Sequence, residues 1–384
     1  MLRLAAMAAP VLKRAQAGDE EAFAELVAPY RRRLHLHCYR MLGSVADADD
    51  LLQETMVAAW RGLSGFGGHS SLQAWLYRIA TNRCLNAIRD TKRRPPTVPV
   101  PPFHPPKPSR RGDVTWLQPY PDAWLEAIAD PAPGPAARFE AAETVRLAFI
   151  AALQRLPPRQ TAAVVLCDVL GFSVAEVATI LETTAPAVKG LLKRARSSLG
   201  RQPGAGAPPA PEPGSAVEAD LAKRFADAFS SDDVDAVVAL LTDDAWLAMP
   251  PAPHEYQGVE AIAGFLRASA TGRAGRRLGL VLTRANTQPA FACYLGRPVD
   301  GRAQPSGLVV LTLEGDRIAD ITRFLDPELP SIFGVTETVL ATGTGPRPGH
   351  GTSGPAPGAA PRLGPRQANA ATSPNAPSAP PHPP

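Results

Sequence analysis

Cysteine is scarce in this sequence, and no two cysteines are close enough to form a Cys-x-x-Cys pair. The four cysteines stand at positions 38, 84, 167 and 293 of 384. This spacing argues against a zinc ribbon and against a dithiol redox motif. His35 and His37 lie beside Cys38, but the two histidines would point to different sides of a helix. We therefore expect no metal site and no bound cofactor.

Long apolar runs are also missing. The apolar start of the chain is interrupted by Pro10, Lys13 and Arg14, which leaves a run too short for a signal peptide. No later run reaches the roughly 20 apolar residues that a membrane-spanning helix needs. We therefore expect a cytoplasmic protein with no membrane partner.

Proline, by contrast, is abundant and clustered. Of 43 prolines, thirteen lie between positions 95 and 135, five between 203 and 213, and twelve after position 345. Segments of this composition contain too little apolar surface to offset the entropy lost on folding, which predicts linkers and a disordered tail. The chain accordingly divides into an N-terminal extension (1–19), a helical segment (20–94), a linker (95–137), a second helical segment (138–200), a short linker (201–215), a mixed domain (216–335) and the tail (336–384).

Residues 71–94 predict a basic amphipathic helix that ends before Pro95. One of its faces is apolar, and another repeats guanidinium and amide groups at helical spacing: Arg78, Asn82, Asn86, Arg89 and Arg93. Arginine can hold a phosphate backbone, and asparagine offers donors and acceptors to bases. The net charge of +4 and the pI of about 9.0 fit a nucleic-acid partner. Taken alone, however, such a face is more typical of the solvated side of an ordinary helix.

Two helices are predicted before this one. The first runs from Glu20 to Leu42 and ends at Gly43, a suitable left-handed cap. The second begins after Ser44, and Asp47 stands in the acidic position of a capping box. It places a mixed polar stripe opposite its apolar stripe: Asp50, Gln53, Glu54, Val57 and Arg61. A docking surface for a basic helix and a solvated face explain this stripe equally well.

The second helical segment ends in a predicted helix-turn-helix. Helices are expected over Arg138–Leu156 and Thr161–Leu170. Ser173 and Glu176 then form a capping box, and a turn at 182–184 precedes a helix with an apolar inner side and a basic outer side. A recognition helix in the major groove needs this division. Gly190 inside that helix should cost about 1 kcal/mol relative to alanine.

The residues after 215 predict helices followed by a curved meander of strands, with a hairpin turn at 314–316. The pattern favours an α+β cone. Such cones often enclose an apolar pocket with a few polar groups. The candidate lining residues, chosen by strand parity or position, are Trp246, Met249, Tyr256, Tyr294 and Arg323. A filled structural core explains the same residues without a ligand.

The first helical segment resembles region 2 of the bacterial extracytoplasmic-function sigma factors. The runs DDLLQET, FGG and AWLYRIATN match that family in order and spacing. The resemblance implies that Asp50, Leu51, Gln53 and Glu54 bind core RNA polymerase. It also implies that Asn82 helps to capture an unpaired base of the minus-ten element, with Phe66, Trp75 and Tyr77 nearby, although we expect Trp75 to belong to the core.

The other two folded segments extend the resemblance. The helix-turn-helix resembles sigma region 4, which reads the minus-thirty-five element, and the DNA contacts that we expect there are Ala187, Lys189, Lys193 and Arg196. The runs DDAWLAMPP, YQG and FLDPELPSIFG resemble a SnoaL-like domain of the NTF2-like superfamily. That resemblance implies that the C-terminal domain regulates the sigma activity in cis. A small molecule is a candidate ligand of this domain. Some NTF2-like relatives are enzymes that use an Asp/His pair, but His254, Asp243 and Asp320 sit in no motif that we can assign.

The linker between the helical segments has unusual aromatic content: Trp116, Tyr120 and Trp124. Its run VTWLQPYPD resembles a motif of the sigma factors with an extra C-terminal domain. In that family the linker runs through the polymerase towards the active-site cleft. Alternatively, these aromatic residues pack on the second or third domain of the same chain.

We therefore expect a multidomain protein with two all-α sigma domains, the second a helix-turn-helix, followed by an α+β NTF2-like cone. The predicted function is that of a sigma factor that recognises and melts promoter DNA as a partner of core RNA polymerase, with no catalytic residues. A conventional helix-turn-helix regulator, and a fusion whose cone has isomerase or cyclase activity, are the alternatives.

Overall fold

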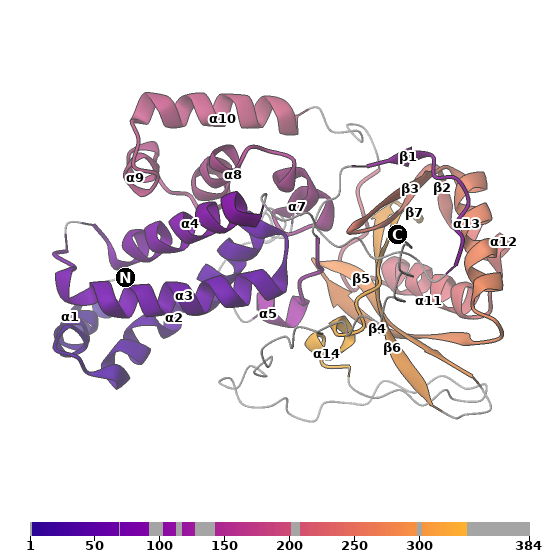
Figure 1. Cartoon of the computed structure of the whole chain (residues 1–384), viewed down its shortest axis with the longest axis horizontal. Helices are drawn as coiled ribbons and strands as arrows, with labels where there is room; N and C mark the ends of the chain where they lie inside the picture. Colours follow the sequence, from indigo (N-terminus) through magenta and orange to yellow (C-terminus); the bar gives the residue numbers. More distant parts are fainter. Residues whose placement is uncertain are drawn as a thin grey trace, which may run out of the picture. The chain divides into compact units, whose positions relative to one another are not determined.

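The computed structural model describes residues 2–68, 70–91, 103–112, 117–126, 143–200, 208–297 and 302–335 (Figure 1). The described residues all belong to one compact unit. The predicted disordered tail, Arg93 and Trp116 lie outside the described residues. No helix in the described part of the chain is long and apolar enough to cross a membrane.

The first helical segment contains four helices and a short 3-10 turn. The predicted helix boundaries at Glu20, Leu42 and Ser44 are confirmed: Gly43 has φ 72°, and the Ser44 side chain accepts a hydrogen bond from the Asp47 N–H. The elements are α1 (Leu2–Gln16), α2 (Glu20–Leu42), α3 (Val45–Gly62), the 3-10 turn η1 (Leu63–Gly65) and α4 (Leu72–Thr91).

Helix α1 was not predicted, because Pro10 interrupts its apolar pattern. It packs on α2, and its Ala15 joins Ala22, Leu26 and Leu63 in a small buried cluster. The N-terminal extension is therefore part of the folded segment.

The second helical segment contains the expected helix-turn-helix. Ser173 and Glu176 form a complete capping box, and Glu182 in the turn has φ 50°. Its elements, with one short helix from the linker, are α5 (Asp122–Glu126), α7 (Leu147–Gln154), α8 (Pro158–Val164), the π-helical turn η2 (Val165–Val169), α9 (Val174–Ile180) and α10 (Ala185–Leu199).

One helix of this segment is interrupted where a continuous helix was predicted, and positions 138–142 of that prediction lie outside the described residues. Where a helix through Val145 was expected, Arg146 is extended (φ −50°, ψ 142°), and α7 starts at Leu147. The physical reason is tertiary: the Val145 carbonyl and the Leu147 N–H are both bonded to side chains of the C-terminal domain.

The C-terminal domain (residues 208–335) is an α+β structure with three helices against a seven-stranded sheet of order β1-β3-β2-β7-β6-β5-β4 (Figure 1). All neighbouring strands are antiparallel except the parallel pair β2 and β7. Its elements are α11 (Ala216–Ser230), α12 (Val234–Val238), β2 (Leu241–Met249), β3 (Ala252–Gln257), α13 (Val259–Gly272), β4 (Arg277–Ala285), β5 (Gln288–Gly296), β6 (Ala303–Glu314), β7 (Arg317–Phe324) and α14 (Leu329–Ile332).

Strand β1 (Arg110–Arg111) belongs to the linker, yet it pairs with β3 at the edge of this sheet. Neither strand was predicted, since both are short and rich in proline or charge. The pairing makes the linker part of the C-terminal domain's sheet.

Two hydrophobic cores lie on the two faces of the sheet. Phe225, Tyr256 and Phe291 belong to the core between the sheet and helices α11 to α13. Ala290 and Tyr294 of β5 belong to a second core, which is continuous with the helical segments. The helical segments and the C-terminal domain therefore share one buried apolar cluster.

Candidate nucleic-acid interface

The polar face of α4 forms as predicted. Arg78, Asn86 and Arg89 are exposed and Asn82 is partly exposed, at positions that share one side of the helix. The Arg89 Nε lies 3.2 Å from a carboxylate oxygen of its neighbour Asp90. Amide and guanidinium groups are thus available along about three turns of α4.

Phe66, which the resemblance places near a captured base, is held by α1. Its ring packs against Trp75 with centroids 5.1 Å apart, and its carbonyl accepts a hydrogen bond of 2.9 Å from Gln16 Nε2. Trp75 is half-buried and contacts the apolar clusters on both sides, which agrees with the expected core role. The sequence offered no signal that the N-terminal extension supports this loop.

Tyr77 faces the protein interior. It is 1 % exposed, and its ring packs against His37 on one side and against Phe172 of the second helical segment on the other, with centroids 5.1 and 5.3 Å apart. Burial lowers the pKa of His37 to about 3, and its Nε2 lies 2.9 Å from the Thr81 hydroxyl. Helix α4 also contacts α8 and α9. The two helical segments are therefore packed together.

The proposed polymerase-binding stripe on α3 is only partly exposed. Asp50, Gln53 and Glu54 lie on the surface, whereas Leu51 is 7 % exposed and packs in the core. Glu54 forms an ion pair of 2.7 Å with Arg83 of α4. Val57, one turn after Gln53, is 49 % exposed, which is unusual for a large apolar side chain. An acidic surface around an exposed apolar residue suits a partner with basic and apolar groups.

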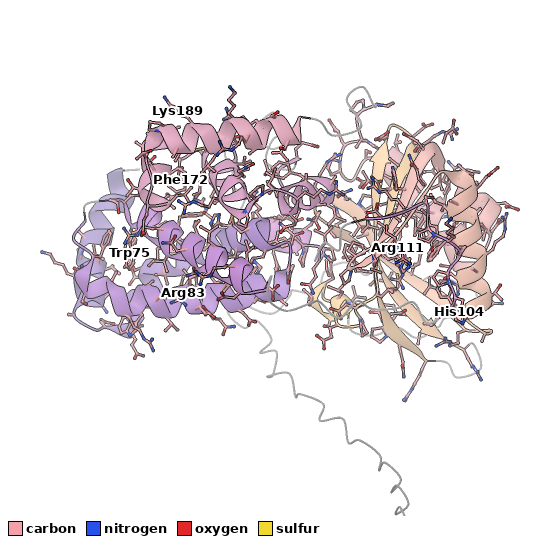
Figure 2. The ribbon with its side chains drawn as sticks, turned by 45° about the horizontal axis from the view of Figure 1, so that its top comes forward. Trp75, Arg83, His104, Arg111, Phe172 and Lys189 are labelled. Carbon is pink, nitrogen blue, oxygen red and sulfur yellow. The ribbon has the colours of Figure 1, made fainter. Side chains whose placement is uncertain are left out.

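Helix α10 has the division expected of a recognition helix. Val188, Leu192 and Ala195 are buried, whereas Lys189 and Lys193 are exposed; Figure 2 shows Lys189 on the outer side of the helix. Ala187 is exposed on its first turn.

Arg196 is less free than predicted, because its guanidinium makes two bonds, of 2.6 and 3.0 Å, to the Asp168 carboxylate. A Cβ at Gly190 would meet only the Arg194 side chain, at 3.5 Å, so the close packing of the fold does not require this glycine.

The five candidate ligand residues of the C-terminal domain are not brought together. Met249 and Tyr256 lie in the core on the helix side of the sheet, whereas Tyr294 lies in the core on the other side. Trp246 is half-buried, and the centroid of its ring lies 4.4 Å from the Cζ atom of the Arg110 guanidinium. Arg323 donates a hydrogen bond of 2.6 Å to the Ser306 carbonyl. The hydroxyls of Tyr256 and Tyr294 donate to the carbonyls of Pro106 and Val335.

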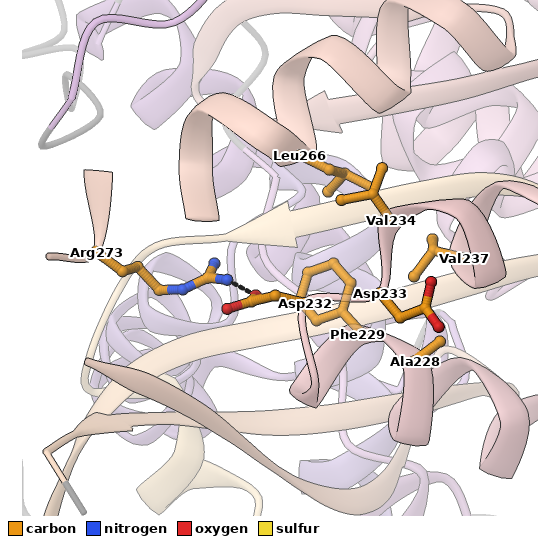
Figure 3. A pocket seen from close by; sticks show the side chains of 8 residues that line it. All are labelled: Ala228, Phe229, Asp232, Asp233, Val234, Val237, Leu266 and Arg273. Carbon is orange, nitrogen blue, oxygen red and sulfur yellow. Dashed lines mark ion pairs between the residues drawn. The ribbon is translucent and has the colours of Figure 1, made fainter. Parts of the chain in front are cut away.

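A small pocket does open between α11, α12 and α13 (Figure 3). Arg273 and Asp232, which both line it, form an ion pair, and the pocket is partly open to solvent. None of the five predicted residues lines it; its walls are Ala228, Phe229, Asp232, Asp233, Val234, Val237, Leu266 and Arg273.

The acidic and histidine residues considered for catalysis do not form a pair. By strand parity, His254 and Asp320 lie on opposite faces of the sheet, and Asp243 is exposed. Burial raises the pKa of Asp320 to about 6, and a hydrogen bond with Thr312 acts in the opposite direction. Among the described residues, no group of three or more His, Cys, Asp or Glu side chains is arranged to hold a metal ion.

The turn between β4 and β5 carries contacts that the sequence did not reveal. Asn286 and Thr287 have φ values of 55° and 62°, typical of a two-residue hairpin turn. Asn286 is fully buried, and its amide donates to the Val145 carbonyl (2.7 Å) and the Tyr39 hydroxyl (2.9 Å). Its Oδ1 accepts from the Tyr120 N–H at 2.8 Å. One side chain thus joins α2, the linker and Val145, which lies two residues before α7.

Neighbouring residues reinforce this junction. The Leu147 N–H donates to Gln288 Oε1 at 3.1 Å, and the Thr287 N–H donates to the Asp122 carboxylate at 2.8 Å. On the linker, Gln118 Oε1 accepts from the Val45 N–H at 2.9 Å, at the start of α3. We call the contacts of residues 286–288 with Tyr39, Tyr120, Asp122, Val145 and Leu147 the junction. The linker residues Tyr120 and Trp124 both pack against His35 of α2, in the first helical segment.

Comparison with known families gives three matches along the chain. Residues 26–94 match Sigma-70 region 2, residues 146–199 match Sigma-70 region 4, and residues 222–321 match the SnoaL-like domain. These spans coincide with the two helical segments and the C-terminal domain described above.

Individual relatives agree. The chain is 41 % identical over 325 residues to "ECF RNA polymerase sigma factor SigG" of Mycobacterium tuberculosis, covering 84 % of this chain and 85 % of that protein. It is 34 % identical over 185 residues to SigM of the same species, covering 48 % of this chain and 79 % of the relative. The crystal structure of M. tuberculosis SigJ covers 80 % of this chain and 98 % of its own, with a TM-score of 0.51 at 23 % identity, which shows a shared fold. The chain therefore belongs to the extracytoplasmic-function family of RNA polymerase sigma factors, with regions 2 and 4 followed by a SnoaL-like domain.

Proposed function

We propose that this sigma factor docks on core RNA polymerase through the exposed side of α3 and contacts promoter DNA through α4 and α10. Helix α10 would read the minus-thirty-five element through Lys189 and Lys193. Helix α4 would hold the minus-ten element, with Asn82 binding an unpaired base. The proposal is supported by two separate helices, each with a buried apolar side and an exposed face of cationic or amide groups. The cytoplasm, where polymerase and promoter DNA meet, would be its place of action.

We further propose that the C-terminal domain regulates this activity in cis by holding a closed form. The observation that carries this proposal is the junction, in which Asn286 bonds to α2, to the linker and to Val145 just ahead of α7. Regions 2 and 4 must reach two separate promoter elements, yet here α4 packs on α8 and α9. Release of the junction would let the two regions separate.

The α3 docking surface can be tested by reversing one charge. The Glu54→Lys variant is expected to bind core RNA polymerase at least tenfold more weakly, because a lysine would repel the basic groups that the acidic stripe is proposed to meet. The variant should fold, since the Glu54–Arg83 pair is exposed and such pairs contribute about 0–1 kcal/mol to stability. Binding would be measured by titrating labelled sigma factor with purified core enzyme.

Glu260→Lys is the matched control, because Glu260 is an exposed glutamate on α13 of the C-terminal domain. It makes the same change in net charge far along the chain from α3. Equal affinity of the Glu54→Lys variant and the native protein for core enzyme would refute the docking surface, and so would an equal loss in both variants.

The proposal assigns no reaction to the C-terminal domain. It is supported by the placement of the catalytic candidates, since His254 and Asp320 lie on opposite faces of the sheet. A conventional DNA-binding regulator would bind promoter DNA tightly without polymerase. Electrophoretic mobility shifts with and without core enzyme would separate that function from the one proposed.

A further inference from the structure

Linker residues 103–112 lie along the outer edge of the C-terminal domain's sheet. Strand β1 pairs with β3 in an antiparallel register, with Arg110 opposite Glu255 and Arg111 opposite His254. The Gly112 N–H donates to the Pro253 carbonyl at 3.0 Å, and the Gln257 N–H donates to the Ser109 hydroxyl at 3.0 Å. Without this segment, β3 would be an open edge strand, which is a template for pairing with another extended chain.

Side chains of the C-terminal domain contact linker residues 103–112 at three points. The Phe103 ring packs against Phe265, with centroids 5.6 Å apart. The Tyr256 hydroxyl donates to the Pro106 carbonyl at 2.9 Å. Arg110 lies over the Trp246 ring and forms an ion pair with Glu255. An aromatic contact, a hydrogen bond to a proline carbonyl and a cation site thus follow one another along the edge.

The backbone of α13 leaves room for the first of these contacts. A Cβ at Gly272 would lie 2.6 Å from the Phe103 Cβ, closer than real side chains approach. At Gly264 in the same helix, a Cβ would meet nothing within 4 Å. The linker therefore packs closely against the end of α13, where only glycine leaves room for it, and not against Gly264 in the middle of the helix.

The two partners also have opposite charge. Residues 103–112 carry Lys107, Arg110 and Arg111 and no acidic residue. Positions 208–335 carry seventeen acidic and eleven basic residues, a net charge of −6. The attraction between them is exposed to solvent and therefore weakened by salt.

The contact has the features of a reversible one. Its ladder is only two residues long, so few backbone hydrogen bonds hold it to β3. All three of its cationic side chains lie at the surface. Extended peptides add to sheet edges in this way, with backbone hydrogen bonds for affinity and side-chain pockets for specificity.

We propose that the β3 edge, with Trp246, Tyr256, Glu255 and Phe265, is a binding site for an extended peptide that carries an aromatic residue, proline and paired arginines. Linker residues 103–112 are its occupant in this structure and exchange on and off it. Because the same linker joins regions 2 and 4 and also enters the junction, its attachment raises the effective concentration of the junction contacts. That regulatory consequence rests on the proposed function, whereas the binding site does not.

A disulfide trap tests the site in the full-length chain. In the Arg111→Cys/His254→Cys variant the two cysteines occupy opposed positions, and opposed Cα atoms in antiparallel pairs are about 4.5–5.5 Å apart, within disulfide range. Mild oxidation should join them, as judged by a mobility shift that dithiothreitol reverses. Cys38, Cys84 and Cys293 are buried, but Cys167 is partly exposed, so the native chain and each single-cysteine variant are the controls.

Two glycine substitutions make the trap specific. Adding Gly272→Ala should slow disulfide formation at least fivefold, because its Cβ displaces Phe103, whereas alanine itself favours the helix. Adding Gly264→Ala should leave the rate unchanged. A synthetic peptide of the sequence FHPPKPSRRG at millimolar concentration should slow the reaction at least threefold, and a scrambled peptide should not.

No disulfide beyond that of the controls, or equal rates in the two glycine variants, would overturn the site. If the synthetic peptide does not slow disulfide formation, the proposal that the linker exchanges on and off the site is wrong.

A readout without new cysteines is tryptic cleavage after Arg110 or Arg111 in the otherwise native chain. Cleavage should be slow with Gly264→Ala and at least fivefold faster with Gly272→Ala, and equal cleavage would again contradict the proposal. Neither readout needs polymerase, so a failure of the binding-site proposal can be distinguished from a failure of the sigma-factor proposal.

Discussion

Replacing Asn286 by alanine is expected to open the junction. The substitution leaves the Tyr120 N–H and the Val145 carbonyl without their partner in a fully buried place, at a cost of about 1–3 kcal/mol each. It also places alanine at φ 55°, which adds about 1 kcal/mol. The sum of about 3–7 kcal/mol corresponds to an opening equilibrium shifted by at least about a hundredfold. Amide hydrogen exchange at Tyr120 and Leu147 should accelerate by at least a hundredfold.

Asn286→Gly separates the two contributions to that effect. Glycine also removes the side-chain hydrogen bonds but tolerates a positive φ, so its exchange rates should fall between those of the native protein and the alanine variant. If regulation in cis operates through the junction, both variants should also give more transcript than the native protein at limiting core enzyme. Unchanged exchange at Tyr120 in Asn286→Ala would contradict the role given to this turn.

Replacing Asn82 by alanine is expected to impair promoter melting rather than promoter binding. An amide that holds an unpaired base contributes about 1–3 kcal/mol, so the fraction of open complex should fall roughly tenfold to a hundredfold. Closed-complex affinity, which depends mainly on phosphate contacts and region 4, should change less than twofold. Permanganate reactivity of unpaired thymines measures the first quantity, and filter binding at low temperature measures the second.

Asn86→Ala provides the matched comparison, since Asn86 has the same side chain about one turn further along the exposed face of α4. It should weaken open and closed complexes by similar, smaller factors, because it lies away from the Phe66 loop. An equal loss of closed binding and melting in Asn82→Ala would count against its assignment to the base pocket.

Local signals were sufficient to predict the helix ends. Gly43, Ser44 and the Ser173–Glu176 capping box each act within a few residues of themselves, and each has the predicted conformation or hydrogen bond. The division of α10 into a buried and a basic side likewise follows from its own periodicity. Family resemblance added the roles of these helices, which composition and spacing alone left open.

Contacts between distant parts of the chain were not predictable in the same way. Asn286 looks like an ordinary turn residue, yet four of its hydrogen bonds go to partners more than a hundred positions away. Residues 110–111 are a strand only because β3 lies beside them. The break in the helix just before Leu147 has a similar cause, since the backbone there is bonded to the C-terminal domain. Leu51 was grouped with exposed neighbours by motif, although its side chain is buried.

Run-off transcription with purified core RNA polymerase tests the central claim most directly. On a promoter identified by selection with the holoenzyme, transcript should appear only when this protein is added, and Asn82→Ala should abolish most of it without loss of closed binding. Absence of transcript, together with failure of the native protein and of Asn286→Ala to co-elute with core enzyme, would contradict the account.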